Sequence, residues 1–289
     1  SVGFIPVQAE SSGGSQAQPA EEEMTAYLFA YFRRPPGQRD DERLCYGVSR
    51  DGYTFRALNG GEPVFTSTLG YKALRDPFIM RGEDGYFYII VTDLLGTSNP
   101  NSTIGIYKTA DLINMEESVL INFGAFDGFG DITRAWAPQA IWCPEHDNGD
   151  GTQGSYMVYL AIYSPSNSEV GTVMYRSFTT DLMDQSKYTA PEMMLAGQET
   201  GSYAADGAID GDITYDPIND RYLMYFDGNR VAASETVDGI YTELKSSPFT
   251  SGKMEGSNIY KLLDEDKWLI CADGQSFGTG FNVYETTDF

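Results

Sequence analysis

The sequence contains few cationic residues, and no long apolar run. Lysine and arginine together number 19 against 42 aspartate and glutamate residues, which gives a formal net charge of −23. This balance provides no basic patch for phosphate groups, so it disfavours nucleic acid and anionic membranes as partners. Solubility outside the cell explains the acidic charge equally well. No apolar run approaches the length of a membrane-spanning helix.

Cysteine and histidine are also scarce. Cys45, Cys143 and Cys271 have no spacing typical of metal ligands, and their odd number argues against a disulfide framework. We expect them to act as small buried hydrophobic residues. The single histidine, His146, lies in the loop 144–154, where we expect a solvated side chain at the periphery of the domain. The sequence therefore predicts no cofactor, and leaves open only a structural calcium or sodium ion.

The N-terminal segment differs in composition from the rest of the chain. Residues 1–9 are interpreted as the end of an apolar signal region with the small-residue pattern Val7-Gln8-Ala9, which predicts a secreted or cell-surface protein. Residues 10–25 have the Ser, Gly, Gln, Ala and Glu content of a flexible linker.

A repeated order of elements runs from Ala26 to Phe289. In four units a short strand leads to a returning strand rich in aromatics, and a fifth returning strand, Ala26–Phe32, stands alone near the N-terminus. A polar segment with a Thr/Ser-x-Asp core follows each of them. The first aromatics of the returning strands are Tyr27, Tyr86, Tyr156, Tyr222 and Trp268. Fixed order with variable loops indicates a repeat architecture, and five units predict an all-β, five-bladed β-propeller. The alternative, a β-sandwich, requires no such repetition.

Two of the predicted blades lack a strand. The segment before Ala26 is interpreted as linker, so blade one has no inner strand, and blade five stops at Phe289 inside its polar segment. A propeller leaves few strand edges unprotected. The sequence therefore predicts that the propeller domain of residues 26–289 is truncated at its C-terminus. A continuation would complete blade five and supply the inner strand of blade one.

Polar and aromatic residues open the predicted inner strands, which all start at one mouth of the channel. These residues are Asp76, Trp136, Gln139, Asp210, Asp212 and Glu255. Carboxyls and an aromatic ring at one mouth suit glycoside hydrolysis, because one carboxyl protonates the leaving oxygen, another activates water, and the ring packs on the sugar. The competing interpretation is that aspartates at strand starts only cap turns.

Four stretches in this order resemble glycoside hydrolase family 43, whose members are five-bladed propellers. They are Arg75-Asp76-Pro77, Trp136-Ala137-Pro138, Ile209-Asp210-Gly211-Asp212-Ile213 and Glu255-Gly256-Ser257. The resemblance implies that Asp76 is the general base of an inverting displacement. It implies that Asp210 tunes and orients the acid, and that Glu255 is the general acid.

Further residues are expected to contact the sugar. Gln139 stands where the family usually has an acidic residue, so we expect it to bind a sugar hydroxyl. Arg134 and Asp93 are placed at the rim and, with Asp212, are expected to bind hydroxyls as well. Trp136 is expected to be a stacking platform, and the alternative is an ordinary core tryptophan.

The resemblance implies an oligo- or polysaccharide substrate and a monomeric enzyme. It favours release of terminal furanosyl residues, α-L-arabinofuranose or β-D-galactofuranose, from plant or microbial polysaccharides. A β-xylosidase or arabinanase of the same family remains an alternative, as does a non-catalytic carbohydrate-binding propeller. The presence of all three acids favours catalysis over binding alone.

Overall fold

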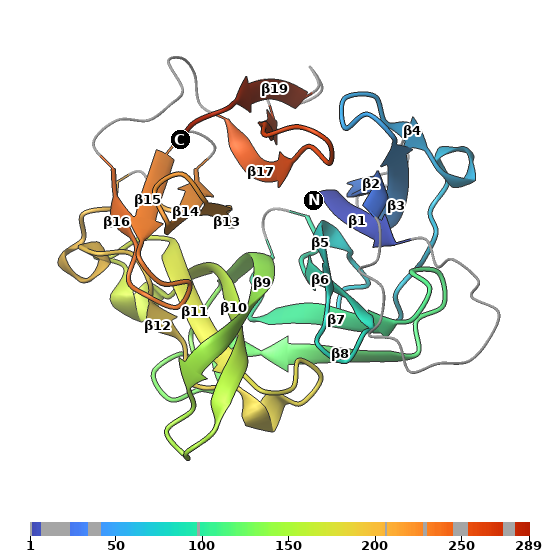
Figure 1. Ribbon diagram of the computed structural model, residues 1–289. Coiled ribbons are helices and arrows are strands. Elements are labelled where there is room, and N and C mark those ends of the chain that lie inside the picture. The colour runs from blue at the N-terminus through green and yellow to red at the C-terminus, as the bar shows by residue number, and fades with distance from the viewer. Residues whose placement is uncertain are drawn as a thin grey trace.

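The computed structural model describes residues 2–6, 24–33, 42–96, 99–205, 207–227, 230–244, 254–273 and 281–289, with backbone only for 2–6 and 281. Five antiparallel sheets surround a common centre (Figure 1). The chain is therefore the five-bladed β-propeller that the repeated order of elements predicts. Within the described ranges no helix is long and apolar enough to cross a membrane.

In each blade the strands follow one another in chain order within the sheet, starting from the inner strand. Blade one consists of β1 (Val2–Pro6), β2 (Met24–Arg33), β3 (Arg43–Ser49) and β4 (Arg56–Ala57). Blade two consists of β5 (Arg75–Arg81), β6 (Phe87–Thr92), β7 (Thr103–Thr109) and β8 (Glu117–Asn122). Blade three consists of β9 (Arg134–Asp147), β10 (Gln153–Tyr163), β11 (Val173–Thr179) and β12 (Glu192–Met193).

Blades four and five complete the ring. Blade four consists of β13 (Asp212–Asp216), β14 (Arg221–Phe226), β15 (Arg230–Ser234) and β16 (Thr242–Glu243). Blade five consists of β17 (Glu255–Lys261), β18 (Trp268–Asp273) and β19 (Phe281–Thr286). Short 3-10 turns lie in the connections, at η1 (Asn59–Gly61), η2 (Phe123–Ala125), η3 (Pro165–Asn167), η4 (Gln185–Lys187) and η5 (Gln198–Thr200).

The second strands of blades two and three are deeply buried. β6 is buried at every position, and β10 is buried at all positions except its two ends. Neighbouring blades cover both faces of these strands, so their sequences are nearly continuous apolar runs instead of alternating ones. The largest core cluster extends over blades two, three and four and includes Tyr88, Tyr159 and Phe226.

Blade one already has four strands. β1 pairs antiparallel with β2, and the register places Val2 opposite Phe29 and Phe4 opposite Tyr27. The prediction that this inner strand comes from chain beyond Phe289 is therefore wrong. Residues 2–6 of the segment 1–9, which was interpreted as a signal-region remnant, form this inner strand, because a short apolar segment is as suitable for a strand as for a signal region.

The expected linker at 10–25 extends too far by its last two residues, since β2 begins at Met24. Residues 10–23 of that segment lie outside the described residues. Blade five shows three strands within the described part of the chain.

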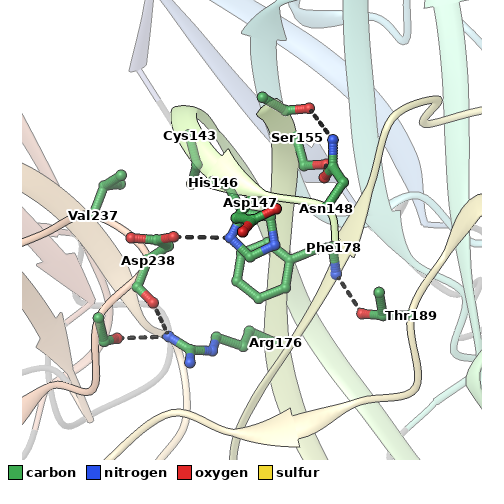
Figure 2. A network of polar contacts seen from close by, with 12 residues as sticks. Cys143, His146, Asp147, Asn148, Ser155, Arg176, Phe178, Thr189, Val237 and Asp238 are labelled. Carbon is green, nitrogen blue, oxygen red and sulfur yellow. Dashed lines mark hydrogen bonds and ion pairs between the residues drawn. The ribbon is translucent and has the colours of Figure 1, made fainter. Parts of the chain in front are cut away.

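Contacts around His146, which lies near the end of β9, join blades three and four (Figure 2). The His146 ring stacks on Phe178 with a centroid separation of 3.7 Å, and its Nδ1 lies 2.8 Å from Oδ2 of Asp238. The guanidinium of Arg176 also lies over Phe178 and donates to the carbonyl oxygen of Asp238 at 2.6 Å. The expectation of a solvated histidine is wrong, because its side chain is only 19% exposed.

Candidate active site

A β-bulge occurs at the start of the inner strand of blade two. β5 pairs with β6 through Arg75 and Thr92, and next through Phe78 and Ile90, so β5 has one residue more in this interval. Asp76 lies in the bulge with φ of 48°, in the left-handed region that favours glycine. The bulge breaks the regular alternation of side chains at the point where the strand starts.

The same bulge occurs in blades three and five. In β9 it contains Ala137, with φ of 47°, and in β17 it contains Gly256, with φ of 62°. Blade four repeats the geometry just before β13. There the N–H of Asp227 donates to the carbonyl of Ile209 at 2.7 Å, and Asp210 follows with φ of 57°.

The four motifs therefore occupy equivalent positions in four blades. In each motif the second residue has a positive φ. The residue two positions after it is the first one that pairs regularly with the second strand of the blade. Bulges commonly re-aim side chains next to active sites. Here they separate two layers of residues that a regular strand would place on one side.

The bulged strand starts surround a cavity of about 420 Å³, to which all five blades contribute. Asp76, Asp210 and Glu255, which the sequence places at one mouth, all line this cavity. Asp76 comes from blade two, Asp210 from the start of blade four, and Glu255 from blade five. The volume is within the range of small-molecule sites.

Asp76 is held by a threonine at the end of β6. Oγ1 of Thr92 donates to Oδ2 of Asp76 at 2.8 Å, and the same oxygen accepts from the N–H of Ala137 at 2.8 Å. Thr92 is fully buried. One hydroxyl therefore links the Asp76 carboxylate to the bulge of the neighbouring blade.

Asp210 contacts the strand start that carries Glu255. Its Oδ2 accepts from the N–H of Gly256 at 3.1 Å. Burial, and next the negative charge of Asp76, raise the pKa of Asp210 to about 7, and Glu255 contributes in the same direction. The Gly256 N–H opposes this rise but does not outweigh it. Asp210 therefore retains a proton closer to neutral pH than an ordinary aspartate does.

Glu255 is the first residue of β17 and pairs with Asp273 at the end of β18. It is exposed at the cavity, and the peptide that follows it is bound to Asp210 through Gly256. The backbone that carries Glu255 is thus positioned by the carboxyl of Asp210.

A second polar layer, which we call the inter-blade clasp, is formed by Gln139, Tyr159, Asp212 and Asn258. The Tyr159 hydroxyl donates to Oε1 of Gln139 at 2.8 Å, and Gln139 in turn hydrogen-bonds Asp212. Oδ2 of Asp212 accepts from Nδ2 of Asn258 at 3.1 Å and from the N–H of Ile259 at 2.6 Å. Blades three, four and five are joined by these bonds.

Asp212 is 4% exposed and does not line the cavity. The prediction that it binds sugar hydroxyls is therefore wrong. Burial raises its pKa to about 7. Gln139 does line the cavity, but its side chain is engaged by Tyr159 and Asp212.

Trp136 and Arg134 form a separate unit on β9. The Arg134 guanidinium lies 4.7 Å from the centroid of the Trp136 ring and 5.0 Å from that of Tyr163. The Trp136 Nε1 donates to Oδ1 of the buried Asn101 at 3.1 Å. Neither Trp136 nor Arg134 lines the cavity, so the structure does not bring the expected platform and hydroxyl ligand to it.

Asp93 also lies away from the cavity. It is 3% exposed, and its carboxylate accepts from the N–H of Tyr71 at 2.8 Å and from Oγ1 of Thr103 at 2.9 Å. Burial raises its pKa. The expected rim residue is therefore a buried anchor for the 67–72 connection.

Sequence reasoning missed several residues of the cavity. Blade one contributes the aromatic residues Phe29, Tyr31 and Phe32 from the end of β2. Their strand was predicted, but no pattern indicated that its end reaches the mouth. Cys271 also lines the cavity and is partly exposed, whereas Cys45 and Cys143 are buried as expected. Over the described residues no group of three or more His, Cys, Asp or Glu side chains could hold a metal ion.

Comparisons with known proteins identify the family and the fold of the chain. A family model described as a probable glycosyl hydrolase domain, related to glycoside hydrolase family 43, matches residues 22–289. An alpha-L-arabinofuranosidase of Bifidobacterium longum subsp. longum is 26% identical over 215 residues, which are 64% of this chain and 18% of that protein. The chain thus spans less than a fifth of the length of this curated relative.

Two solved structures show the fold. The alpha-L-arabinanase of Penicillium chrysogenum, complexed with arabinobiose, superposes with a TM-score of 0.59 at 14% identity, over 90% of this chain and 71% of that chain. An exo-beta-1,3-galactanase from Clostridium thermocellum superposes with a TM-score of 0.55 at 12% identity, over 75% of this chain and 46% of that chain. At these identities the likeness concerns the fold alone.

Proposed function

The chain belongs to the glycosidases related to glycoside hydrolase family 43, and from this premise we propose that it hydrolyses glycosidic bonds with inversion in the cavity of Asp76, Asp210 and Glu255. The observation that carries the proposal is the convergence of three carboxyls from three blades on one cavity. An inverting mechanism needs two such groups on opposite sides of the bond, with room between them for a water molecule.

In this proposal Asp76 is the general base. Its Oδ2 accepts a hydrogen bond from the Thr92 hydroxyl, which holds the carboxylate in one orientation. The other carboxylate oxygen then takes the proton of the attacking water. Water attacks the anomeric carbon as the glycosidic carbon–oxygen bond breaks, and the sugar is released with the opposite anomeric configuration.

Glu255 is the general acid that gives its proton to the leaving oxygen. Asp210 supports it in two ways, by binding the N–H of Gly256 and by adding a carboxyl whose pKa is raised to about 7. A cluster with such a group holds a proton near neutral pH, which is what an acid catalyst at that pH requires.

For the substrate we propose a terminal furanosyl residue, α-L-arabinofuranose or β-D-galactofuranose, on an oligo- or polysaccharide. The similarity to an alpha-L-arabinofuranosidase supports the first of these sugars. A β-xylosidase or arabinanase activity is the second candidate, since the arabinanase structure shares the fold. We further propose that the protein acts as a monomer outside the cell, consistent with its net charge of −23.

A panel of nitrophenyl furanosides and pyranosides tests the proposal. We expect the wild-type protein to release nitrophenol from one furanoside preferentially, and Asp76→Asn to lose about 10²–10⁴-fold in kcat/KM. Asp266→Asn is the matched control, because Asp266 lies in the turn after β17, at the end of the strand opposite Glu255, and its side chain is 95% exposed.

Two outcomes would contradict the proposal. Oligosaccharide binding without turnover of any substrate would identify a non-catalytic carbohydrate-binding propeller. An Asp76→Asn variant as active as the Asp266→Asn control would remove Asp76 from the mechanism.

A further inference from the structure

We propose that Thr92 is the positioning residue of the catalytic base, an inference that rests on the proposed role of Asp76. In the hydrolytic step a bond forms between the water oxygen and the anomeric carbon while the glycosidic bond breaks. The water proton goes to Asp76, and the proton of Glu255 goes to the leaving oxygen. The carboxylate must therefore present one defined oxygen to the water.

The Thr92 hydroxyl has only one available orientation. Its Oγ1 lies 2.8 Å from the backbone nitrogen of Ala137, and an N–H group can only donate, so Oγ1 accepts there. The single hydroxyl proton is then directed to Oδ2 of Asp76, also at 2.8 Å. A threonine hydroxyl usually rotates to suit its surroundings, but here the Ala137 N–H fixes it.

The same hydroxyl connects two strained segments. Asp76 and Ala137 have φ of 48° and 47°, in the left-handed region that is unfavourable for a residue with a side chain. These residues are the left-handed positions of the bulges in adjacent blades. Because Thr92 is fully buried and bonded to both, the direction of the Asp76 carboxylate is fixed by the seam between blades two and three.

The surrounding charges leave this role to the threonine. Arg75 precedes Asp76, but its guanidinium is directed to Glu42 at 3.3 Å and to the carbonyl of Gly96 at 3.2 Å. Asp210 and Glu255 share the cavity with Asp76, but a carboxylate offers no hydrogen-bond donor. The Thr92 hydroxyl does, and it donates to Oδ2 of Asp76.

The test compares Thr92→Val with Thr92→Ser and with Thr109→Val. Thr109 is a matched control, because it is also a fully buried threonine of blade two, but it bonds the turn at Asp111 and Leu112. Both valine variants lose a buried hydroxyl and are expected to lose thermal stability. Only Thr92→Val should affect the carboxylate.

We expect Thr92→Val to lower kcat by about 10–100-fold with little change in KM, because the base is misdirected while substrate binding is retained. Thr92→Ser should restore kcat, because it keeps the hydroxyl donor, and Thr109→Val should keep the wild-type kcat and KM. Should Thr92→Val fail to fold, Thr92→Cys provides a weaker donor of similar size, with an intermediate loss expected.

Each failure has a distinct signature. A folded Thr92→Val variant with the wild-type kcat overturns this inference and leaves the proposed function intact. A Thr92→Cys variant equal to wild type does the same. A wild-type protein inactive on the whole substrate panel overturns the proposed function, and the inference with it.

Discussion

Asp210 and Asp212 lie two residues apart, and the pKa of each is raised to about 7, yet the structure separates them. Asp210 lines the cavity and binds the peptide that follows Glu255, whereas Asp212 is buried in the inter-blade clasp. The bulge at Asp210 causes the difference, because it breaks the alternation that would place both side chains on one face. A raised pKa alone therefore does not distinguish a cavity residue from a buried one. The position of the residue relative to the bulge makes this distinction.

The largest expected effect concerns Glu255, the proposed acid next to Asp210 in the cavity. Glu255→Gln should lower kcat/KM by about 10³-fold or more for substrates with a poor leaving group. Nitrophenyl substrates need little protonation, so their loss should be about tenfold. Equal losses for both classes of substrate would argue against Glu255 as the acid.

The second prediction compares the two aspartates directly. Asp210→Asn should lower kcat/KM by about 10²-fold or more, because the cluster loses a titrating carboxyl next to Glu255. Asp212→Asn should stay within about tenfold of wild type, since it acts only through the clasp. Steady-state kinetics at one pH are sufficient, and a larger loss for Asp212→Asn would reverse the assignment of the two layers.

The third prediction concerns the raised pKa of Asp212, the aspartate of the inter-blade clasp. The folded-state pKa of Asp212 is about 7 against an ordinary value of 3.8, so the folded protein binds the extra proton between these values. Its contribution to stability is complete below pH 3.8 and is lost as the pH rises towards 7. Asn cannot titrate, so Asp212→Asn should gain in Tm relative to wild type as the pH rises from 4 to 7.

The slope of that gain is at most about 1.4 kcal/mol per pH unit in the free energy of unfolding. Thermal denaturation of both proteins at four or five pH values measures it. A difference in Tm that does not change with pH would show that Asp212 is charged in the folded protein at all these values.

The smallest effect is expected from a substitution that removes one hydrogen-bonding hydroxyl from the clasp. Tyr159→Phe deletes a hydroxyl that donates to Gln139 and accepts from the N–H of Ile213 at 3.3 Å. We expect a loss of about 1–2 kcal/mol in the free energy of unfolding, with little change in kcat, because the cavity acids are untouched. Denaturant unfolding and kinetics on the same sample check this, and a large loss of kcat would show that the clasp also shapes the cavity.

Much of the fold could be predicted from the sequence, because each blade repeats the same order of strands. The four motifs also located the three acids that share the cavity. The bulges could not be predicted, since Asp76, Ala137 and Asp210 are non-glycine residues with positive φ. Without the bulges, Asp212 and Trp136 appear equivalent to the cavity residues, although neither lines it.

Two other misassignments have separate causes. β1 was missed because five apolar and small residues fit a signal region as well as a strand. Asp93 follows β6 directly, and a sequence cannot tell a carboxylate that binds ligand from one that binds the N–H of Tyr71. Burial decides between these roles, and burial depends on the loop that covers the residue.

Product stereochemistry tests the central claim most directly. Proton NMR of the first turnovers, on a substrate from the panel that the wild-type protein cleaves, resolves the anomer released before mutarotation. Asp76 as base and Glu255 as acid predict that the first product has the anomeric configuration opposite to that of the substrate. A first product with the same configuration as the substrate would contradict the account.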